Sequence, residues 1–439
     1  MNQRWTLHVE NFARIESADI EMAPLMCFIG DNNSGKSYVM ALLWGLLYHS
    51  WYFLFSDNNV AVEKQKICST WREKYFEQDC IVDDTAIQKY VELFNALLDF
   101  HKEKIVADIF NQNIPVGKIE IRNLQNFHDV SLYHSQSEIY IKNQSPIFEM
   151  RGFNYQKWVN IDFAICWSLI MGGITTGYPI EEATNRPIYL PASRTGLLLV
   201  HKLIASKATR NIFSMNSVED FQEKLTAPYV QFLELLIKLQ NTAEITDDRK
   251  LALARFLQDE IIHGNITVKE EGKAIRYSPM DSDTELPMNI TSSVVTEIAT
   301  LLLLLTTRIP LRLVVIEEPE AHLHPALQKK IAQLMIRFVH SGIPIWITTH
   351  SDTILQHFNN MIKLSNRSKE EREELLKEFS YTEEDLLTPK EINLYQFERG
   401  VKHTTIQKLK SGKYGFVVPS FNKAIDELMS EIFAFQEDD

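Results

Sequence analysis

One stretch constrains the possible folds of this sequence more than any other, the segment from Leu25 to Leu43. An apolar run of strand type ends at Gly30, a short polar loop follows, and an apolar segment of helix type begins after Ser37. The residues from Gly30 to Ser37 match the pattern G-x-x-x-x-G-K-[ST] without a mismatch, in the strand–loop–helix context that this motif requires. Glycine lets the loop turn its N–H groups inward around phosphate oxygens, and the helix dipole adds positive charge. A plain Gly/Asn-rich turn is the weaker interpretation.

Side chains of this loop have the chemistry that a bound nucleotide needs. Lys36 is expected to reach the β- and γ-phosphates, and the hydroxyl of Ser37 is expected to bind Mg²⁺. The residues expected to contact the nucleotide are Gly30, Asp31, Asn32, Asn33, Ser34, Gly35, Lys36 and Ser37.

The composition restricts the class of protein. The 439 residues suffice for two or three domains, or for one large domain with an insertion. Hydrophobic residues make up 45% and charged residues 23%, as in ordinary globular proteins. The net charge of −13 gives no global attraction toward nucleic acid or an anionic membrane, although it leaves room for a local basic groove.

The cysteine pattern and the apolar segments favour a cytoplasmic protein. The four cysteines are well separated and form no C-x-x-C pair, which argues against zinc and against a disulfide framework and suits a reducing cytosol. The first residues contain no apolar region of the signal-peptide type. The most apolar stretch, residues 294–316, is interrupted by Glu297, Arg308, Pro310 and Arg312, so we expect a buried helix and strand and no membrane span.

Strand-type and helix-type segments alternate along the chain, which predicts a mainly parallel sheet with ligands at the carboxyl ends of its strands. Ala192 to Gly196 is predicted as a turn beside a short strand at Pro187 to Pro191. Residues 367–387 are expected to form a charged, solvated helical face. The other strands are expected at 5–9, 17–22, 25–29, 118–121, 138–141, 312–316, 343–347, 391–397 and 404–409, with a hairpin at 265–278. Helices are expected after Ser37, within 59–115, and at 155–172, 217–240, 248–262, 293–307, 327–339 and 422–435.

Two adjacent acids, Glu317 and Glu318, end the buried strand at 312–316. Acids at the end of an apolar strand are costly to bury unless they have a function. Downstream of a phosphate-binding loop, one acid is expected to hold Mg²⁺, directly or through water, and the next to orient the attacking water. The alternative is a strand end that is simply exposed to solvent.

His350 ends the next strand, beside the acidic pair, where it is placed to contact a γ-phosphate. A lone histidine is more often structural, and that alternative stays open. His322 and His324 lie in the loop after the acids, and a metal site there would need further ligands nearby. Packing of the loop, or a contact between subunits, is the preferred interpretation for these two.

These motifs together resemble the ATPase head of the ABC/SMC superfamily, and more narrowly its OLD- and RecF-like branch, of the kind grouped as AAA_15 or AAA_21. The resemblance covers the first fifty residues and roughly 185–360. It implies ATP and Mg²⁺ as ligands, with ATP held between two subunits. The implied motifs are Walker A at Gly30–Ser37, Walker B with Glu317 as the metal ligand and Glu318 as the catalytic acid, a D-loop at Ala321–Pro325, and a switch histidine at His350.

Two departures from the family pattern bear on activity. The metal-binding acid of Walker B is usually Asp, and Glu317 is one methylene longer, which predicts a shifted Mg²⁺ or weaker turnover. The signature segment, which contacts the ATP of the other subunit, is matched by Thr291–Val295, with Ser293 as the residue that binds in trans. Val294 stands where the family has glycine and hinders close approach of the backbone to phosphate. The sequence therefore predicts weak ATP binding in trans and slow hydrolysis.

The segment Leu190–Thr195 resembles another that is common in this branch. Its Arg194 is expected either to reach phosphate or a neighbouring subunit, or to be an ordinary arginine of a surface turn. The sequence does not decide between these interpretations.

The resemblance implies an α/β fold, an ABC-type ATPase head with a mixed, mainly parallel sheet and a large, mostly helical insertion. The expected divisions are an N-terminal lobe with Walker A at 1–58, an insertion with a small β portion at 59–184, and a C-terminal lobe at 185–439 with a helical arm at about 200–262. The residues after His350 show no two-metal nuclease pattern, and residues 59–280 show no sustained heptads of an SMC coiled coil.

This combination resembles the ATPase subunits of two-gene prokaryotic anti-phage systems such as PARIS. It implies an oligomeric, ATP-driven sensor or scaffold that controls a separate effector, a nuclease or toxin, with a phage protein or DNA as the trigger. Two alternatives stay open, a RecF-like DNA-repair ATPase that DNA stimulates and a nucleotide-gated scaffold that does not hydrolyse ATP. A transporter ATPase fits poorly, because the inserted region does not resemble a short helical subdomain that couples to membrane helices.

Overall fold

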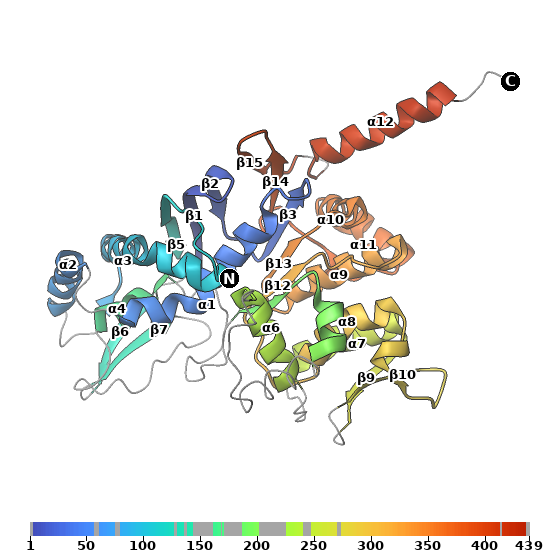
Figure 1. Ribbon diagram of the computed structural model, residues 1–439, viewed down its shortest axis with the longest axis horizontal. Coiled ribbons are helices and arrows are strands. Elements are labelled where there is room, and N and C mark those ends of the chain that lie inside the picture. Colours follow the sequence, from blue (N-terminus) through green and yellow to red (C-terminus); the bar gives the residue numbers. More distant parts are fainter. Residues whose placement is uncertain are drawn as a thin grey trace, which may run out of the picture.

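A nine-stranded sheet runs through the molecule in the order β5-β1-β2-β15-β14-β3-β13-β12-β8 (Figure 1). Its strands are β1 (Gln3–Phe12), β2 (Ile15–Glu21), β3 (Leu25–Gly30), β5 (Lys118–Asn126), β8 (Ile188–Leu190), β12 (Val314–Glu317), β13 (Ile345–Thr348), β14 (Ile392–Arg399) and β15 (Thr404–Leu409). The computed structural model describes residues 3–56, 61–74, 80–126, 130–135, 138–143, 161–167, 169–170, 187–201, 225–239, 247–269, 274–412 and 415–435.

The sheet is mixed and mainly parallel, which confirms the predicted fold class. The pairs β2–β15, β14–β3, β3–β13, β13–β12 and β12–β8 are parallel, whereas β1–β5, β1–β2 and β14–β15 are antiparallel. The hairpin β14–β15 lies between β2 and β3, which are consecutive strands in the sequence. As a result β3 has a parallel neighbour on each side, and the loop that follows Gly30 leaves from the middle of the sheet.

Helices cover both faces of the sheet, each around an apolar core of its own (Figure 1). Alternate residues of β3 point to opposite faces, so that Met26 and Phe28 belong to one core and Leu25, Cys27 and Ile29 to the other. Helices α1 and α3 cover the first core, and α8, α9 and α10 cover the second. The helices are α1 (Lys36–Ser56), α2 (Val62–Glu73), α3 (Asp84–Phe110), α4 (Ile161–Trp167), α6 (Ala227–Lys238), α7 (Asp248–Leu257), α8 (Ser293–Leu305), α9 (Pro325–His340), α10 (Asp352–Ser365), α11 (Lys369–Glu378) and α12 (Pro419–Phe435).

The segment after residue 59 contributes directly to the main sheet and its first core. Strand β5 pairs with β1 along the edge of the sheet, and α3 packs against both β5 and α1. A separate small sheet is formed by β4 (Cys80–Ile81), β6 (Val130–Ser135) and β7 (Glu138–Asn143). The boundaries predicted at 58/59 and 184/185 stay predictions.

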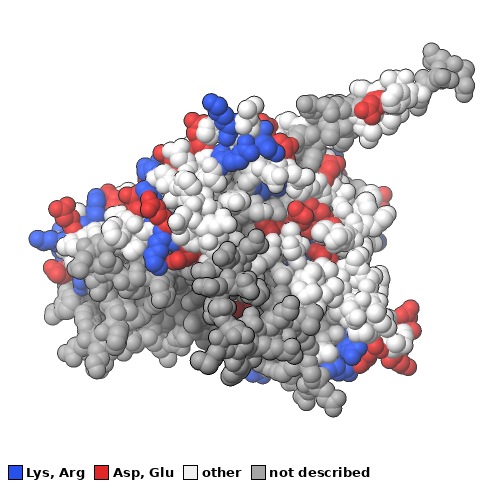
Figure 2. Space-filling view, viewed as in Figure 1, with Lys and Arg blue, Asp and Glu red and all other residues white. Residues whose placement is uncertain are grey.

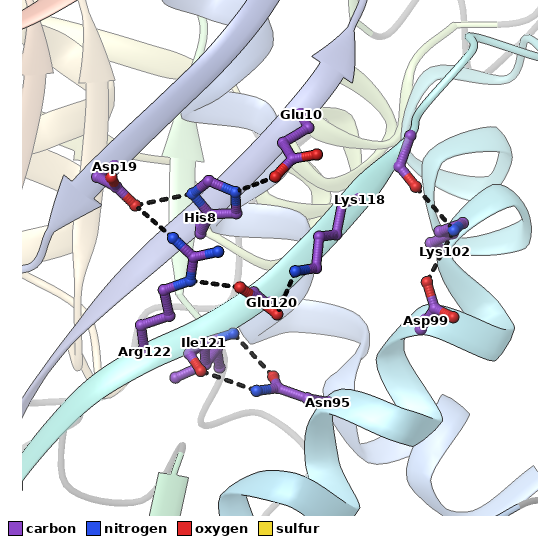
Figure 3. A network of polar contacts seen from close by, with 11 residues as sticks. His8, Glu10, Asp19, Asn95, Asp99, Lys102, Lys118, Glu120, Ile121 and Arg122 are labelled. Atoms are coloured by element: carbon purple, nitrogen blue, oxygen red, sulfur yellow. Dashed lines mark hydrogen bonds and ion pairs between the residues drawn. The ribbon is translucent and has the colours of Figure 1, made fainter.

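The face of β5, β1 and β2 that carries polar side chains is held by a network of ion pairs (Figure 3). His8 of β1 lies between two carboxylates, 2.8 Å from Asp19 and 2.7 Å from Glu10. Arg122 of β5 pairs with Asp19 at 3.6 Å and also with Glu120. The hydrogen bond to His8 holds the pKa of Glu10 below its usual value. Trp5, Leu7 and Val9 on the opposite face of β1 belong to the first core, so a slip of one residue would turn them out of it and separate His8 from both carboxylates. The core and the network together therefore fix the register.

Most elements lie where the sequence places them, and one prediction is wrong. Arg194 and Gly196 do not form a turn, because residues 194–201 are helical. The amide of Leu197 donates to the carbonyl of Ser193 at 3.2 Å, which makes Ser193 the residue at which this helix begins. Glycine lowers helix propensity but does not prevent a helix whose apolar face is buried, as Leu198 is here.

The C-terminal lobe otherwise follows the predicted pattern. Helix α6 falls within the predicted helix at 217–240, of which residues 217–224 lie outside the described part of the chain. The helix predicted at 248–262 is α7 followed by a π-helical turn, η3 (Gln258–Ile262). The hairpin predicted at 265–278 is β9 (Gly264–Val268) and β10 (Ile275–Pro279), with β11 (Leu286–Pro287) as a third strand. Helix α11 is exposed along most of its length, as predicted for a solvated face.

The last described helix, α12, extends away from the body of the molecule (Figure 1). Its side chains from Leu428 to Phe435 are exposed, so this part of α12 adds little to either core. In the described part of the chain, no helix combines the length and the apolar character needed to cross a membrane.

A buried lysine of α7, which contacts the chain just after α8, makes the stability of this lobe depend on pH. Lys250 of α7 is only 2% exposed, and its Nζ donates to the carbonyl oxygens of Thr307 and, at 2.9 Å, of Ile309. Burial lowers the pKa of Lys250 from 10.5 to about 8. Between these two values the unfolded chain binds more protons at Lys250 than the folded chain does. The contribution of Lys250 to the free energy of unfolding therefore rises with pH, by about 3 kcal/mol across the interval.

We expect this rise to disappear in Lys250→Met. The free energy of unfolding in urea would be measured for the parent and the variant at about pH 8 and about pH 10. Subtracting the value of the variant from that of the parent at each pH removes the contribution of all other titrating groups. The free energy of unfolding of the parent, relative to the variant, should increase with pH. A difference that stays constant over this range would show that Lys250 keeps an ordinary pKa in the folded chain.

Candidate functional site

The loop from Gly30 to Ser37 has the backbone conformation of an anion-binding turn. Gly30, Asn33 and Gly35 adopt positive φ angles of 130°, 59° and 95°. A Cβ atom on Gly30 would lie 2.0 Å from the carbonyl oxygen of Phe397, so the close approach of β14 leaves no room for any other residue. Successive turns of this kind point backbone N–H groups into one concavity, where phosphate oxygens bind.

Lys36 is held across the loop by the loop itself. Its Nζ donates hydrogen bonds to the carbonyl oxygens of Gly30 at 2.8 Å and Asp31 at 2.7 Å. The side chain is buried, and burial lowers the pKa of Lys36 from its usual value. The hydroxyl of Ser34 is buried with no hydrogen-bond partner among the described residues. This unpaired polar atom and the concave backbone fit a bound phosphate group.

The remaining predicted ligands of the loop are open to solvent. Asp31, Asn32, Asn33 and Ser37 are exposed. The carboxylate of Asp31 also accepts a hydrogen bond from the amide of Arg399 at 3.2 Å, so the last strand but one fixes the start of the loop. This contact spans most of the chain and has no local signal in the sequence.

Glu317, at the end of β12, has a carboxylate that is already hydrogen-bonded. Its Oε1 accepts from the hydroxyl of Tyr189 at 2.8 Å, and its Oε2 accepts from the amide of Ala192 at 3.0 Å. Burial and the adjacent Glu317 raise the pKa of Tyr189, which keeps the phenol protonated as a donor. Each carboxylate oxygen has a second lone pair, so Glu317 retains the capacity to bind Mg²⁺ or a water on Mg²⁺.

Glu318 has a strained backbone and a side chain that faces solvent. Its φ is +46°, in the left-handed region that residues other than glycine seldom adopt. Its amide donates to the carbonyl of Thr348 at 2.9 Å, which ties β12 to β13. Its Oε1 lies 3.9 Å from Nε2 of His350. Strain of this kind occurs at functional sites, where the surrounding contacts hold one orientation.

His350 lies close to both motifs, as predicted. Burial and the positive charge of Lys36 lower the pKa of His350 from its usual value, while Glu318 and Asp31 act in the opposite direction. Strand β13 pairs in parallel with both β3 and β12, so the carboxyl ends of these three strands lie side by side at one edge of the sheet. The neutral imidazole is favoured there, and it can donate one hydrogen bond to phosphate.

Glu320 is part of this site, although the sequence interpretation gave it no role. Its Oε1 accepts a hydrogen bond from the amide of His350 at 2.7 Å. Burial raises the pKa of Glu320 above its usual value. Glu320 thus connects the loop after β12 to the switch histidine. A third acid so close to a buried strand was the signal in the sequence.

Arg194 is not an ordinary arginine of a surface turn, because its side chain is buried at 3% exposure. Contact of Arg194 with phosphate or with a neighbouring subunit, the other role predicted for it, stays a prediction. Its guanidinium donates to the carbonyl oxygens of Glu317 at 2.6 Å and Glu318 at 3.0 Å, and it forms an ion pair with Glu297 of α8. Arg194 lies at the start of the helix at 194–201, which follows β8. From there its side chain contacts the main chain of the acidic pair and not the carboxylates.

The other predicted residues lie in loops or at helix ends. Ser293 is exposed at the first position of α8, and the preceding Ser292 caps that helix by accepting from the amide of Val295. His324 caps α9 through Nδ1, which accepts from the amide of Ala326 at 3.3 Å. This local contact is consistent with loop packing for His324, and the alternative of a contact between subunits stays a prediction. Within the described ranges, no three His, Cys, Asp or Glu side chains form a cluster able to hold a metal ion.

The family model of the AAA ATPase domain, AAA_15, matches residues 6–165 and 199–355. The chain belongs to this family. The matched segments of the AAA ATPase domain contain the loop at Gly30–Ser37, the acidic pair and His350, whereas Arg194 falls in the unmatched interval. No curated protein matches the sequence of this AAA ATPase.

Several solved structures resemble this AAA ATPase over most of its length. They include an SMC head bound to the C-terminal winged-helix domain of ScpA, at 10% identity and a TM-score of 0.39, covering 93% of this chain and 98% of that one. The SMC head domain of Thermotoga maritima matches at 10% identity and a TM-score of 0.34, covering 93% and 100%. The SMC head of Pyrococcus furiosus with an extended coiled coil matches at 11% identity and a TM-score of 0.36, covering 98% and 99%.

Proposed function

We propose that this chain hydrolyses ATP with Mg²⁺ and acts as the sensor or scaffold subunit of a bacterial anti-phage defence system, in which it oligomerises and controls a separate nuclease or toxin. The observation that carries the hydrolytic part is the convergence of Lys36, Glu318 and His350 at the carboxyl ends of three neighbouring strands. This is the edge of a parallel sheet at which α/β proteins bind their ligands.

Each residue of the site has a defined part in this reaction. A bound nucleotide would replace the loop carbonyls as the partner of Lys36, and the backbone of Gly30–Ser37 would bind the phosphates. Ser37 and Glu317 would hold Mg²⁺, which neutralises the charge that develops on the phosphates. Glu318 would orient and deprotonate the attacking water, and His350 would donate to the γ-phosphate. Magnesium in such sites is bound by one or two protein side chains together with phosphate and water, so Ser37 and Glu317 would suffice as its protein ligands.

The position of the C-terminal strands supports a separate effector. After His350, the described residues form α10, α11, β14, β15 and α12, and both strands belong to the ATPase sheet. These two strands therefore complete the ATPase sheet, and a separate effector is the proposal that goes with this arrangement. The anti-phage assignment itself rests on the resemblance of the motifs to defence ATPases.

A second candidate is a nucleotide-gated scaffold that binds ATP without hydrolysing it. Both oxygens of Glu317 already accept a hydrogen bond, from Tyr189 and from Ala192, which leaves each oxygen one lone pair for Mg²⁺ or for a water on Mg²⁺. Val294 is only partly buried at the start of α8, where the family has glycine. Both features favour slow turnover.

Lys36→Ala tests the proposed function most directly. We expect the parent to hydrolyse ATP only with Mg²⁺, and Lys36→Ala to lose at least about a hundredfold in turnover, because the loss removes a phosphate contact of the transition state. Lys104→Ala is the control, since Lys104 is exposed on α3 and pairs only with Asp108 at 3.1 Å. ATP binding without turnover in the parent would support the scaffold.

The effect of DNA on ATP turnover and the binding of an effector distinguish the defence role from the DNA-repair role. On the face in Figure 2, basic and acidic side chains of the described residues are interspersed and form no continuous basic band. We therefore expect duplex DNA to leave turnover unchanged. Stimulation by DNA that weakens with salt would favour the DNA-repair ATPase.

Co-expression with the product of the neighbouring gene should yield a complex, and failure of any nuclease or toxin to co-purify would contradict the defence role.

A further inference from the structure

Arg194 joins two parts of the molecule that the proposed reaction needs to connect. Its Nη1 donates to the carbonyl oxygens of Glu317 at 2.6 Å and Pro191 at 3.3 Å, and its Nη2 donates to that of Glu318 at 3.0 Å. The same Nη2 forms an ion pair with Oε1 of Glu297. One guanidinium therefore contacts the acidic strand end, the loop after β8 and helix α8.

Glu297 is tied to the same helix that carries the predicted signature residue. It lies four positions after Ser293 on α8, so the two residues are stacked on neighbouring turns of one helix face. Ser293 is exposed at the helix N-terminus, whereas Glu297 is 2% exposed. The second oxygen of Glu297 accepts a hydrogen bond from the hydroxyl of Thr195, the residue after Arg194. Any movement of α8 along its axis must therefore move Arg194 or break this pair.

Besides Glu297, the Arg194 guanidinium contacts the strained backbone of Glu318. Its amide is held by Thr348 and its carbonyl by Arg194, while its φ is +46°. A left-handed residue held on both sides by hydrogen bonds keeps its side chain in one direction. The direction of the Glu318 carboxylate thus depends on the position of Arg194. A buried ion pair of this kind is weak evidence for a role in stability alone, because desolvation offsets most of its attraction.

We infer that Arg194 is a positioning residue that couples α8 to Glu318, so that contact of Ser293 with the ATP of a second subunit sets the orientation of the water-activating carboxylate. The inference rests on the proposed function, since it assumes ATP bound between two subunits. Arg194 is not expected to touch nucleotide. It acts through Glu297 on one side and the Glu317–Glu318 main chain on the other.

Arg194→Lys and Glu297→Gln test the coupling, because each keeps a polar side chain but removes the bridge. We expect kcat for ATP to fall by about tenfold to a hundredfold in either variant, with the KM within about twofold of the parent, since small misplacements of a catalytic group have effects of this size. The double variant should be no slower than the worse single variant, as for two parts of one unit.

Arg72→Lys is the matched control. Arg72 pairs with Asp162 at 2.9 Å, and the two side chains are 12% and 2% exposed, but the pair lies between α2 and α4, on elements that do not carry the site. We expect the melting temperature of Arg72→Lys to fall as much as that of Arg194→Lys, with kcat unchanged. An equal loss of kcat in Arg72→Lys, or an unchanged kcat in Arg194→Lys, would overturn the coupling.

Hydrogen exchange gives a readout that does not require hydrolysis. ATP with Mg²⁺ should slow exchange in a peptide spanning residues 314–321 of the parent, and Ser293→Arg should abolish that protection. If Arg194 couples Ser293 to Glu318, Arg194→Lys should also abolish the protection of residues 314–321 while ATP stays bound. Protection that survives in Arg194→Lys would overturn the inference and leave the ATPase intact. Protection without turnover in the parent would support the coupling and reject the hydrolytic function.

Discussion

Replacing Glu318 with glutamine is expected to lower ATP turnover by at least about a hundredfold while ATP binding persists, because a general base contributes roughly 10² to 10⁴ to a rate. Glutamine has nearly the same shape as glutamate but does not accept a proton from water. The Glu318 carboxylate lies 3.9 Å from His350 and faces solvent, so its loss leaves no unpaired group in the interior. Turnover and ATP affinity would be measured on the same preparation.

The control for this prediction is Glu370→Gln on α11. Glu370 is also exposed, and the change of net charge is the same, so its turnover should equal that of the parent. If Glu318→Gln retained full turnover, the water-activating acid would be another residue, and Glu320 would be the first alternative. Loss of ATP affinity in Glu318→Gln would mean that the carboxylate holds the nucleotide complex and does not act on water.

Replacing Gly30 with alanine is expected to destabilise the fold by roughly 3 kcal/mol or more and to abolish ATP binding. The φ of Gly30 is +130°, and an added Cβ would lie 2.0 Å from the carbonyl oxygen of Phe397. That oxygen belongs to the backbone of β14 and cannot move without breaking the pairing of β14 with β3. Urea unfolding would measure the stability, and a fluorescent ATP analogue would measure the binding.

Gly196→Ala is the matched control for the effect of glycine. Among the described residues outside its own helix, no heavy atom lies within 4 Å of a Cβ built on Gly196, and the residue is within the helix at 194–201. Alanine there should raise the free energy of unfolding, by up to about 1 kcal/mol, because alanine is the better helix former. If Gly30→Ala lowered the free energy of unfolding no more than a substitution at the surface does, β14 would not approach the loop this closely.

The features that the sequence predicts well depend on local pattern. The strand, loop and helix around Gly30–Ser37 follow from consecutive residues, and so do β12 with its acidic pair and β13 with His350. Parallel strands place their carboxyl ends at one edge, so the convergence of these motifs also follows from their order in the chain. Confirmation of the AAA ATPase domain family came from the same segments.

The features that the sequence does not predict depend on contacts between distant residues. Arg194 meets Glu297, 103 positions later in the chain, and no periodicity links the two. The Gly196 nearby suggested a turn, although burial of Leu198 makes the segment helical. The position of Glu320 beside the acidic pair was visible in the sequence, but its hydrogen bond from the amide of His350, 30 positions later, was not.

The position of β14 and β15 between β2 and β3 has a consequence for synthesis of the chain. The strand that leads into the phosphate loop is made within the first thirty residues, but one of its two neighbours begins at Ile392. Until the ribosome has released that segment, β3 has at best one partner, and β5, β1 and β2 pair with each other but with no other strand of the sheet. Long-range pairing of this kind is slow and exposes apolar strands. The nascent chain therefore lacks a finished nucleotide site for nearly its whole translation.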